Sequence, residues 1–173
     1  MAGADSLKCI PLLYHFTDRR NLPSIREHDG LYPMTELRKK NIKVVAPGGN
    51  QWSQDADGIK GMDAYVHLCF RNNHPMEYLA RQAGRIGDTI FLQIHPDVLT
   101  WDDVLFTDDV ANKAGVETHT IEEAGKIIDF EVLYTRTNWS DPKVQARLQQ
   151  AEKYEILIPE KIPLKMISNL PNG

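Results

Sequence analysis

The sequence lacks most of the motifs by which common enzyme classes are recognised. It has no Gly-x-Gly-x-x-Gly and no Gly-x-x-x-x-Gly-Lys-Ser/Thr, so the usual phosphate-binding loops are missing, and Gly48-Gly49 alone is a weak signal. His-Glu-x-x-His and Cys-x-x-Cys are also missing, and the six histidines show no ligand spacing, so we expect no bound metal. No serine or cysteine stands in a recognisable nucleophile motif.

Cysteines and long apolar runs are scarce as well. The two cysteines, Cys9 and Cys69, lie far apart and are expected to be free thiols in a reducing compartment. No stretch approaches the roughly 20 apolar residues that a membrane-spanning helix needs. The N-terminus shows no basic patch followed by an apolar run, so no signal peptide is visible. Together these features predict a cytoplasmic protein that does not enter a membrane.

Positive charge is not in excess, since 20 Lys and Arg stand against 24 Asp and Glu, giving a net charge of −4. This balance argues against a protein that coats nucleic acid through charge alone, but a local groove for nucleic acid remains compatible with it. Basic residues do gather in a few places: Arg19-Arg20, Arg38-Lys39-Lys40 with Lys43, and Arg81 with Arg85. Such clusters are more often solvated surface than binding patches.

The 173 residues contain no repeat and no long linker, which predicts a single domain over 1–173. Apolar runs predict strands at 10–16, 64–70, 89–94 and 154–159, with a last strand at 164–167. Helical patterns occupy 21–30, 35–40, 75–83, 120–127 and 141–153, and 46–62 is the most loop-like stretch. Strands and short helices mix without regular alternation, so we expect an α+β fold and not a doubly wound sheet.

Three short segments contain candidate functional residues. In Tyr14-His15-Phe16-Thr17, strand alternation puts His15 and Thr17 on one side, where they could hold an amide or ribose hydroxyls. The strand 64–70 and the turn Pro75-Met76 could form the floor of a pocket for a flat ring. Each segment also fits an ordinary structural role, as a capped strand end or as core.

The third segment is Tyr154-Glu155-Ile156-Leu157-Ile158-Pro159, in which Glu155 interrupts a hydrophobic strand. Alternation places Glu155 with Leu157, while Tyr154, Ile156 and Ile158 face the other way. A carboxylate on such a strand is costly unless it is partnered or lines a cleft. An edge strand with Glu155 in water is the alternative.

In this order, the segments resemble the DarT family of DNA-modifying ADP-ribosyltransferase toxins. The resemblance rests on Tyr14-His15-Phe16-Thr17, Asn21-Leu22-Pro23-Ser24-Ile25 with Gly30-Leu31, Tyr65-Val66 with Phe70, Pro75-Met76, Trp139-Ser140-Asp141 and Glu155-Ile156-Leu157-Ile158-Pro159. It implies the ADP-ribosyltransferase fold, a split β-sandwich with short flanking helices and a NAD⁺ cleft between two packed sheets. No single motif is specific, but the ordered set spans nearly the whole chain.

The resemblance also implies roles for individual residues. Glu155 would be the catalytic glutamate, with Glu152 as the alternative if the register differs, and His15, Thr17 and Asn21 would hold NAD⁺. Phe70 and Met76 would lie near the cofactor, and Arg38 would be the functional arginine that clamps phosphate or steadies the transferred group. Because most family members modify a base in single-stranded DNA, we expect a nucleic-acid side formed by Trp52 of the 46–62 loop, Arg81 and Arg85.

As a family member the chain would be the toxin of a toxin–antitoxin pair, neutralised by an antitoxin with a macrodomain that removes ADP-ribose. Two alternatives stay open at this stage. The acceptor could be RNA or a protein side chain, which the acidic pI mildly favours, or the chain could be a NAD⁺-binding or nucleic-acid-binding module without turnover.

Overall fold

The centre of the molecule is an antiparallel sheet of six strands in the order β4-β1-β3-β7-β5-β6. The structure is a computed structural model that describes residues 7–47, 61–135 and 138–170. The strands of this sheet are β1 Leu13–Asp18, β3 Val66–Cys69, β4 Thr89–Ile94, β5 Leu105–Thr107, β6 Thr118–Thr120 and β7 Glu155–Ile158. A second sheet pairs β2 Gly30–Leu31 with β8 Ile162–Pro163.

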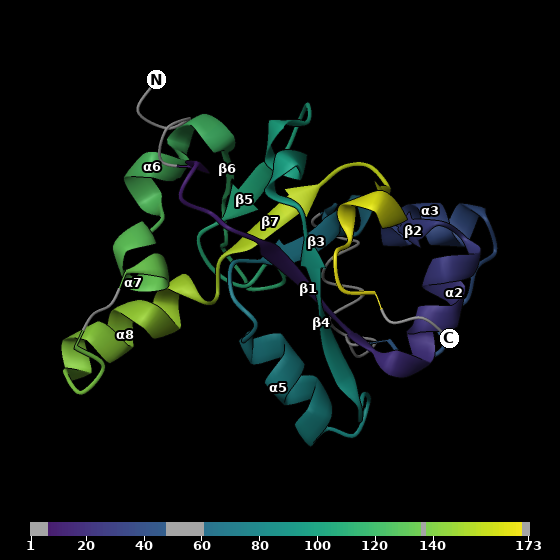
Figure 1. Cartoon of the computed structure of the whole chain (residues 1–173), viewed down its shortest axis with the longest axis horizontal. Coiled ribbons are helices and arrows are strands. Elements are labelled where there is room, and N and C mark those ends of the chain that lie inside the picture. The colour runs from purple at the N-terminus through teal and green to yellow at the C-terminus, as the bar shows by residue number, and fades with distance from the viewer. Residues whose placement is uncertain (1–6, 48–60, 136–137, 171–173) are drawn as a thin grey trace.

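Short helices surround the large sheet (Figure 1). The α-helices are α2 Leu22–Glu27, α3 Met34–Lys39, α5 Pro75–Gln82, α6 Ala124–Ile127, α7 Phe130–Tyr134 and α8 Pro142–Ala151. Helices α2 and α3 lie with β2 beyond one end of the sheet, and α6, α7 and α8 lie beyond the other (Figure 1). Five 3₁₀ turns complete the described elements: η1 Arg19–Asn21, η2 Met62–Ala64, η3 Pro96–Thr100, η4 Ile121–Glu123 and η5 Leu164–Met166. Within the described residues, no helix has the length and apolar character that crossing a membrane requires.

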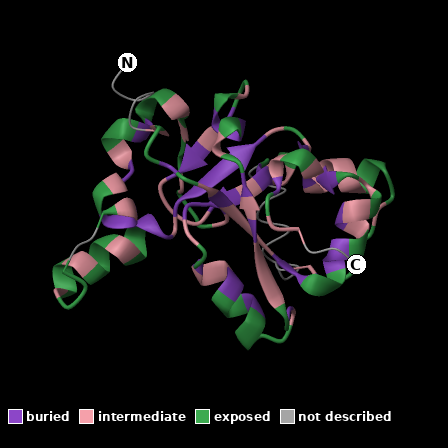
Figure 2. Ribbon diagram, in the orientation of Figure 1, coloured by how far each residue is buried: buried purple, intermediate pink, exposed green. Residues whose placement is uncertain are grey.

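Strand β7 lies inside the sheet, bonded to β3 on one side and to β5 on the other. All four of its residues are buried, as Figure 2 shows for the central strands. Ile156 and Ile158 belong to the main core, whereas Leu157 packs with Met62 and Ala111 in a smaller cluster on the opposite face. The predicted alternation is therefore confirmed, and Glu155 shares the face of Leu157. Because β7 is an interior strand, the alternative of an edge strand with Glu155 in water is wrong.

The two-stranded sheet depends on Gly30. This residue has φ +141°, and a Cβ placed on it would lie 2.1 Å from the carbonyl oxygen of Ile162. Only glycine permits so close an approach of β2 to β8. The helix predicted over 21–30 ends at Glu27 with His28 as its C-cap, and Gly30, which follows Asp29 with its φ of 58°, begins a strand.

The α+β class and the presence of two sheets are confirmed, although the second sheet has only two strands. The strand predicted at 164–167 is wrong: residues Leu164–Met166 form η5, and Ile167 makes one isolated bridge to Ile94. Strands β5 and β6 were not predicted. Each has three residues, which is too short to establish a period in the sequence.

Candidate active site

A cleft of about 300 Å³ opens beside the strands β1, β3 and β7. Its other walls come from α2, β2 and α3, from the chain segment 42–47, and from the loop 110–112 that follows β5. The polar side chains in its lining include His15, Thr17, Asp18, Asn21, His67, His74 and Glu155. These come from segments far apart in the sequence, and they include four of the residues that the sequence assigned to NAD⁺ binding or catalysis.

Glu155 is a buried carboxylate that is fully engaged by hydrogen bonds. Its Oε1 lies 3.2 Å from Nδ1 of His67 on the neighbouring strand, and its Oε2 accepts from the backbone N–H of Ala111. The residue is 7% exposed. Burial raises the pKa of the Glu155 carboxyl, but the hydrogen bond and charge of His67, the charge of His74 and the Ala111 amide outweigh it, so the net pKa lies below its usual range. Glu155 is thus held ionised in the cleft wall.

His15 is fixed by the same neighbour. Its Nδ1 donates to the backbone carbonyl of His67 at 2.9 Å, because a carbonyl oxygen can only accept. Nε2 is then the unprotonated acceptor of the neutral ring, and no described residue bonds to it. Burial lowers the pKa of His15, which favours this neutral form. His15 therefore offers one acceptor nitrogen to the cleft.

Thr17 and Asn21 form a unit at the end of β1. The Asn21 amide donates to Thr17 Oγ1 at 3.0 Å and to the carbonyl of Ala46 at 2.8 Å, and its Oδ1 accepts from the Ala46 N–H at 2.9 Å. Its side-chain polar atoms are thus occupied by the chain itself. Asn21 shapes the cleft by clamping the 42–47 segment to β1, whereas the Thr17 hydroxyl keeps its own proton for another acceptor.

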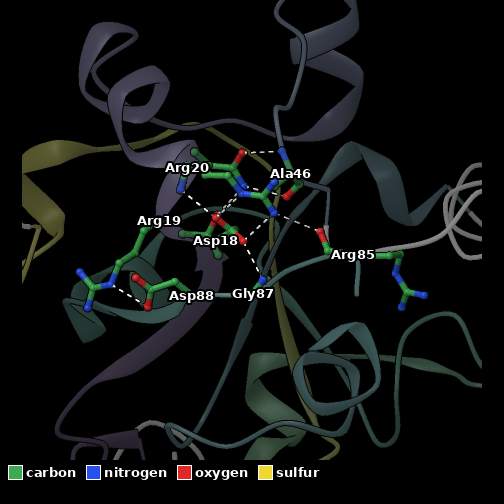
Figure 3. Close-up of polar contacts among 9 residues, drawn as sticks. Asp18, Arg19, Arg20, Ala46, Arg85, Gly87 and Asp88 are labelled. Carbon is green, nitrogen blue, oxygen red and sulfur yellow. Dashed lines mark hydrogen bonds and ion pairs between the residues drawn. The ribbon is translucent and has the colours of Figure 1, made fainter. Parts of the chain in front are cut away.

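An ion pair between buried Asp18 and half-exposed Arg20 holds the end of β1 in place (Figure 3). Asp18 accepts from the N–H and Nε of Arg20 at 2.8 and 2.9 Å, and from Arg20 Nη2 and the Gly87 N–H at 2.9 Å each. The hydrogen bond from the Arg20 guanidinium, together with the Gly87 and Arg20 amides, holds the pKa of Asp18 well below its usual range despite burial. Figure 3 shows the neighbouring pair Arg19–Asp88 at the surface beside it.

Met76 and His74 border the cleft where α5 begins. His74 caps the helix, since its Nδ1 accepts from the Met76 N–H at 3.2 Å, and its ring stacks on Phe16. Met76 lies in the cleft lining as the sequence implied. Phe70 does not, because it is 1% exposed and packs in the main core with Val66 and Leu68. Alternation along β3 turns these residues away from His67 and Cys69, so Phe70 can influence the cleft only through packing.

Arg38 lies beside the cleft and not in it. It lines a smaller cavity of about 180 Å³ that shares His15 and His67 with the main cleft. Its Nη1 donates to Asp63 at 2.6 Å, and about half of the Arg38 side chain is exposed. A guanidinium in this position can reach a group that enters the smaller cavity, and it is already neutralised by Asp63.

Arg81, Arg85 and Glu152 lie outside the cleft lining. Arg81 pairs with Glu77 on α5, and the Arg85 carbonyl is 3.5 Å from Nη2 of Arg20. Trp52 lies outside the described residues. Glu152, the alternative catalytic glutamate, accepts from Asn73 at the end of α8 and does not line the cleft.

The sequence did not single out His67, although it is the contact that Glu155 and His15 share. A polar residue interrupts an apolar strand at His67 as it does at Glu155, but only the register of β3 and β7, which pairs Cys69 with Glu155, shows that both side chains lie on one face. The role of the Ala111 amide had no signal, since every residue except proline carries a backbone N–H.

Within the residues that the structure describes, no three His, Cys, Asp or Glu side chains are grouped so as to hold a metal ion. The cleft instead presents a fixed, ionised carboxylate beside neutral polar groups. A fixed anion stabilises positive charge that develops on a sugar carbon when a glycosidic bond breaks, the arrangement that glycoside-cleaving enzymes use. The cleft therefore contains the kind of carboxylate that an enzyme acting on glycosidic bonds requires.

Comparison with known families makes the assignment specific. The family model for DarT, described as ssDNA thymidine ADP-ribosyltransferase, matches residues 14–170. The chain belongs to this family. No curated protein sequence matches it.

Solved structures share the fold at low sequence identity. Thermus sp. 2.9 DarT in complex with ADP-ribosylated ssDNA is 17% identical, with a TM-score of 0.67 over 91% of this chain and 79% of that one. The same protein in complex with NAD⁺ gives 18%, a TM-score of 0.60, and 92% and 80% coverage. Thermosipho africanus DarTG in complex with ADP-ribose gives 19% and a TM-score of 0.64, over 91% of this chain but only 43% of that longer one.

Proposed function

We propose that this enzyme transfers ADP-ribose from NAD⁺ to thymine in single-stranded DNA, with Glu155 as the catalytic residue. The family description supplies the reaction and the acceptor. The observation that supports the site is Glu155, an ionised carboxylate buried in the wall of a polar cleft. Similar folds have been solved with NAD⁺ and with ADP-ribosylated DNA.

The transfer is a substitution at the anomeric carbon of the nicotinamide ribose. The bond to nicotinamide breaks and nicotinamide leaves with the bonding electrons, while the ribose develops oxocarbenium-like charge that Glu155 stabilises. A nitrogen of the base forms the new bond. In thymine within DNA the one ring N–H is at N3, and its proton passes to the Glu155 carboxylate and then to water.

His15 and Thr17 are proposed to bind NAD⁺ directly, through Nε2 and the hydroxyl, and Met76 to contact it from the helix side. Asn21 is proposed to act by holding Thr17 and the Ala46 backbone in place. Arg38 is proposed to meet the acceptor or the transferred group from the smaller cavity.

Single-stranded DNA is proposed to reach the cleft past α5, where Arg81 and Arg85 would contact it. Trp52 is proposed to contact the same strand. Unpaired bases can enter an enzyme cleft without the cost of opening a duplex. We further propose that the enzyme works as a toxin in the cytoplasm, and that its partner is a macrodomain antitoxin that removes the added ADP-ribose. The longer DarTG chain, which this chain spans to 43%, is the relative that suggests such a partner.

The test is transfer of label from NAD⁺ to a thymidine-containing single-stranded oligonucleotide, with Glu155→Gln against Glu152→Gln as the matched control. Both glutamates are buried and hydrogen-bonded, but only Glu155 lines the cleft. We expect Glu155→Gln to lower transfer at least about 100-fold, the scale of removing one pre-arranged electrostatic contact, and Glu152→Gln to retain it.

Four further acceptors run in parallel: an oligonucleotide without thymidine, duplex DNA, RNA and a protein lysate. Label found only on RNA or only on protein would show that thymine in single-stranded DNA is not the acceptor. NAD⁺ binding without transfer to any acceptor would favour a binding module, and full activity of Glu155→Gln would refute the catalytic assignment.

A further inference from the structure

Both ring nitrogens and the backbone carbonyl of His67 have hydrogen-bond partners in this part of the fold. Its Nε2 lies 2.7 Å from the carbonyl of Met62, its Nδ1 lies 3.2 Å from Oε1 of Glu155, and its backbone carbonyl accepts from His15. Strands β3 and β7 pair so that His67 lies opposite Leu157 and Cys69 opposite Glu155. The ring of His67 therefore reaches Glu155 diagonally across one face of the sheet.

The partners of the ring determine where its protons lie. The Met62 carbonyl can only accept, so Nε2 carries a proton and donates it. The other oxygen of Glu155 accepts from the Ala111 amide, which favours an ionised carboxylate. An ionised carboxylate can only accept, and Nδ1 must then also donate. The arrangement is that of an imidazolium bonded through both nitrogens.

The other titratable groups near this pair do not supply the same charge. Burial lowers the pKa of His15 and raises the pKa of Cys69, so both are favoured in their uncharged forms, and burial also lowers the pKa of His74, whose charge lowers the pKa of Glu155 less than His67 does. Among the charged groups of neighbouring elements, Asp63 on η2 lines the smaller cavity with His67 and is paired with Arg38 on α3, and the charge of Glu152 at the end of α8 acts on His74 and Cys69. Of these groups, Arg38 is bound to its own acid, which makes His67 the direct positive partner of Glu155.

We propose that His67 is a positioning residue for the transfer: its doubly donating ring fixes the Glu155 carboxylate toward the cleft in ionised form, and its backbone carbonyl fixes the acceptor nitrogen of His15. This inference rests on the proposed role of Glu155. It predicts that the ring contributes to the chemical step through its Nδ1 contact, whereas the Nε2 contact with Met62 serves only to anchor the ring.

Two conservative variants separate the two contacts. His67→Asn places an amide donor near the position of Nδ1 and gives up the bond to Met62, whereas His67→Gln reaches Met62 and gives up the bond to Glu155. We expect His67→Gln to lower kcat about tenfold to a hundredfold, the range produced by losing a charge-assisted hydrogen bond, and His67→Asn to lower it by less than about threefold. The KM for NAD⁺ should change less than kcat in both variants.

The pH profile of kcat gives a second readout that a purely structural role would not change. His67 lowers the pKa of Glu155, so its removal should move the acidic limb of the profile to higher pH, further in His67→Gln than in His67→Asn. A reversed order of activity, equal losses, or an unmoved acidic limb would overturn the proposal.

A measurement on the wild-type enzyme covers the case in which the variants do not fold. Imidazole ¹⁵N resonances of His67, assigned through its own backbone, should show both nitrogens protonated at pH 7, and an unprotonated Nδ1 would overturn the proposal. Glu155→Gln separates a failure of the proposed catalytic role of Glu155 from a failure of the positioning role of His67. If that variant keeps full transfer, the proposed function of Glu155 fails, whereas a lost transfer with the wrong order of His67 variants refutes only the positioning role.

Discussion

Replacement of Asp18 by asparagine tests whether the Asp18–Arg20 ion pair holds the end of β1, and with it the wall of the cleft, in place. Asp18 is 1% exposed and offers two acceptor oxygens to four donors, three from Arg20 and one from Gly87. Asparagine keeps one acceptor oxygen and turns an NH₂ toward two of these donors (Figure 3). The backbone N–H of Arg20 or of Gly87 then loses its acceptor, and the charge pairing with Arg20 is lost.

The expected cost follows from these losses. Loss of the acceptor of one of these part-buried donors costs about 1–3 kcal/mol, and the lost pairing with the half-exposed Arg20 adds up to about 1 kcal/mol, so Asp18→Asn should lower the free energy of unfolding by about 1–4 kcal/mol. The matched control is Arg19→Ala, which removes the exposed pair with Asp88, of which 45% and 76% of the side chains are accessible. That pair should contribute less than about 1 kcal/mol.

Urea unfolding at several pH values provides the assay, and the sign of the pH effect is fixed. The pKa of Asp18 is lowered in the folded state, so its contribution is complete above the unfolded pKa of about 3.9 and is lost as the pH falls through and below that value. The difference between wild type and Asp18→Asn should therefore narrow by roughly 1.4 kcal/mol per pH unit below pH 4. A cost below 1 kcal/mol at pH 7, or a difference that widens in acid, would refute the reasoning.

Two further predictions concern the walls of the cleft. Gly30→Ala should destabilise the protein by more than about 2 kcal/mol, because its Cβ would lie 2.1 Å from the Ile162 carbonyl oxygen; Gly87→Ala, where a Cβ meets no atom within 4 Å, is the control and should cost less than about 1 kcal/mol in the same urea assay. Asn21→Ala should raise the KM for NAD⁺ at least about tenfold, because it releases Ala46 and the 42–47 segment; titration calorimetry with NAD⁺ and steady-state kinetics would measure this, and an unchanged KM would show that the clamp does not shape the NAD⁺ site.

Local pattern was enough to place the elements that carry the candidate site. The interior strand with Glu155, the strand with His15 and Thr17, and the helix beginning at Pro75 all lie within about three residues of the predicted positions. Their signals are strong because apolar runs, proline and alternation act over four or more consecutive residues. The three-residue strands β5 and β6 had no such signal. Strand β5 is nevertheless part of the site, because its Thr107 pairs with Glu155 and the loop that follows it contains Ala111, whose amide donates to Glu155.

The roles of individual residues were harder to predict than their positions. Alternation along β3 already places Phe70 with Val66 and Leu68, and applying it would have assigned Phe70 to the core. The contact of Arg38 with Asp63 joins segments 25 residues apart, and pattern alone does not show whether an arginine is paired. For the same reason, the sequence could not show that the side-chain amide of Asn21 is hydrogen-bonded to the backbone of Ala46.

The surroundings of Glu155 show why the role of a buried glutamate cannot be predicted from its residue type alone. Burial by itself would push this carboxyl toward its protonated form, in which it could neither stabilise an oxocarbenium-like ribose nor accept a proton. The ionised form persists because a ring on β3 and an amide in the 110–112 loop both donate to it. Neither donor is near Glu155 in the sequence. The ionised state of Glu155, on which its proposed role depends, therefore follows from the interior position of β7 between β3 and β5, which brings both donors within hydrogen-bonding reach of one carboxylate.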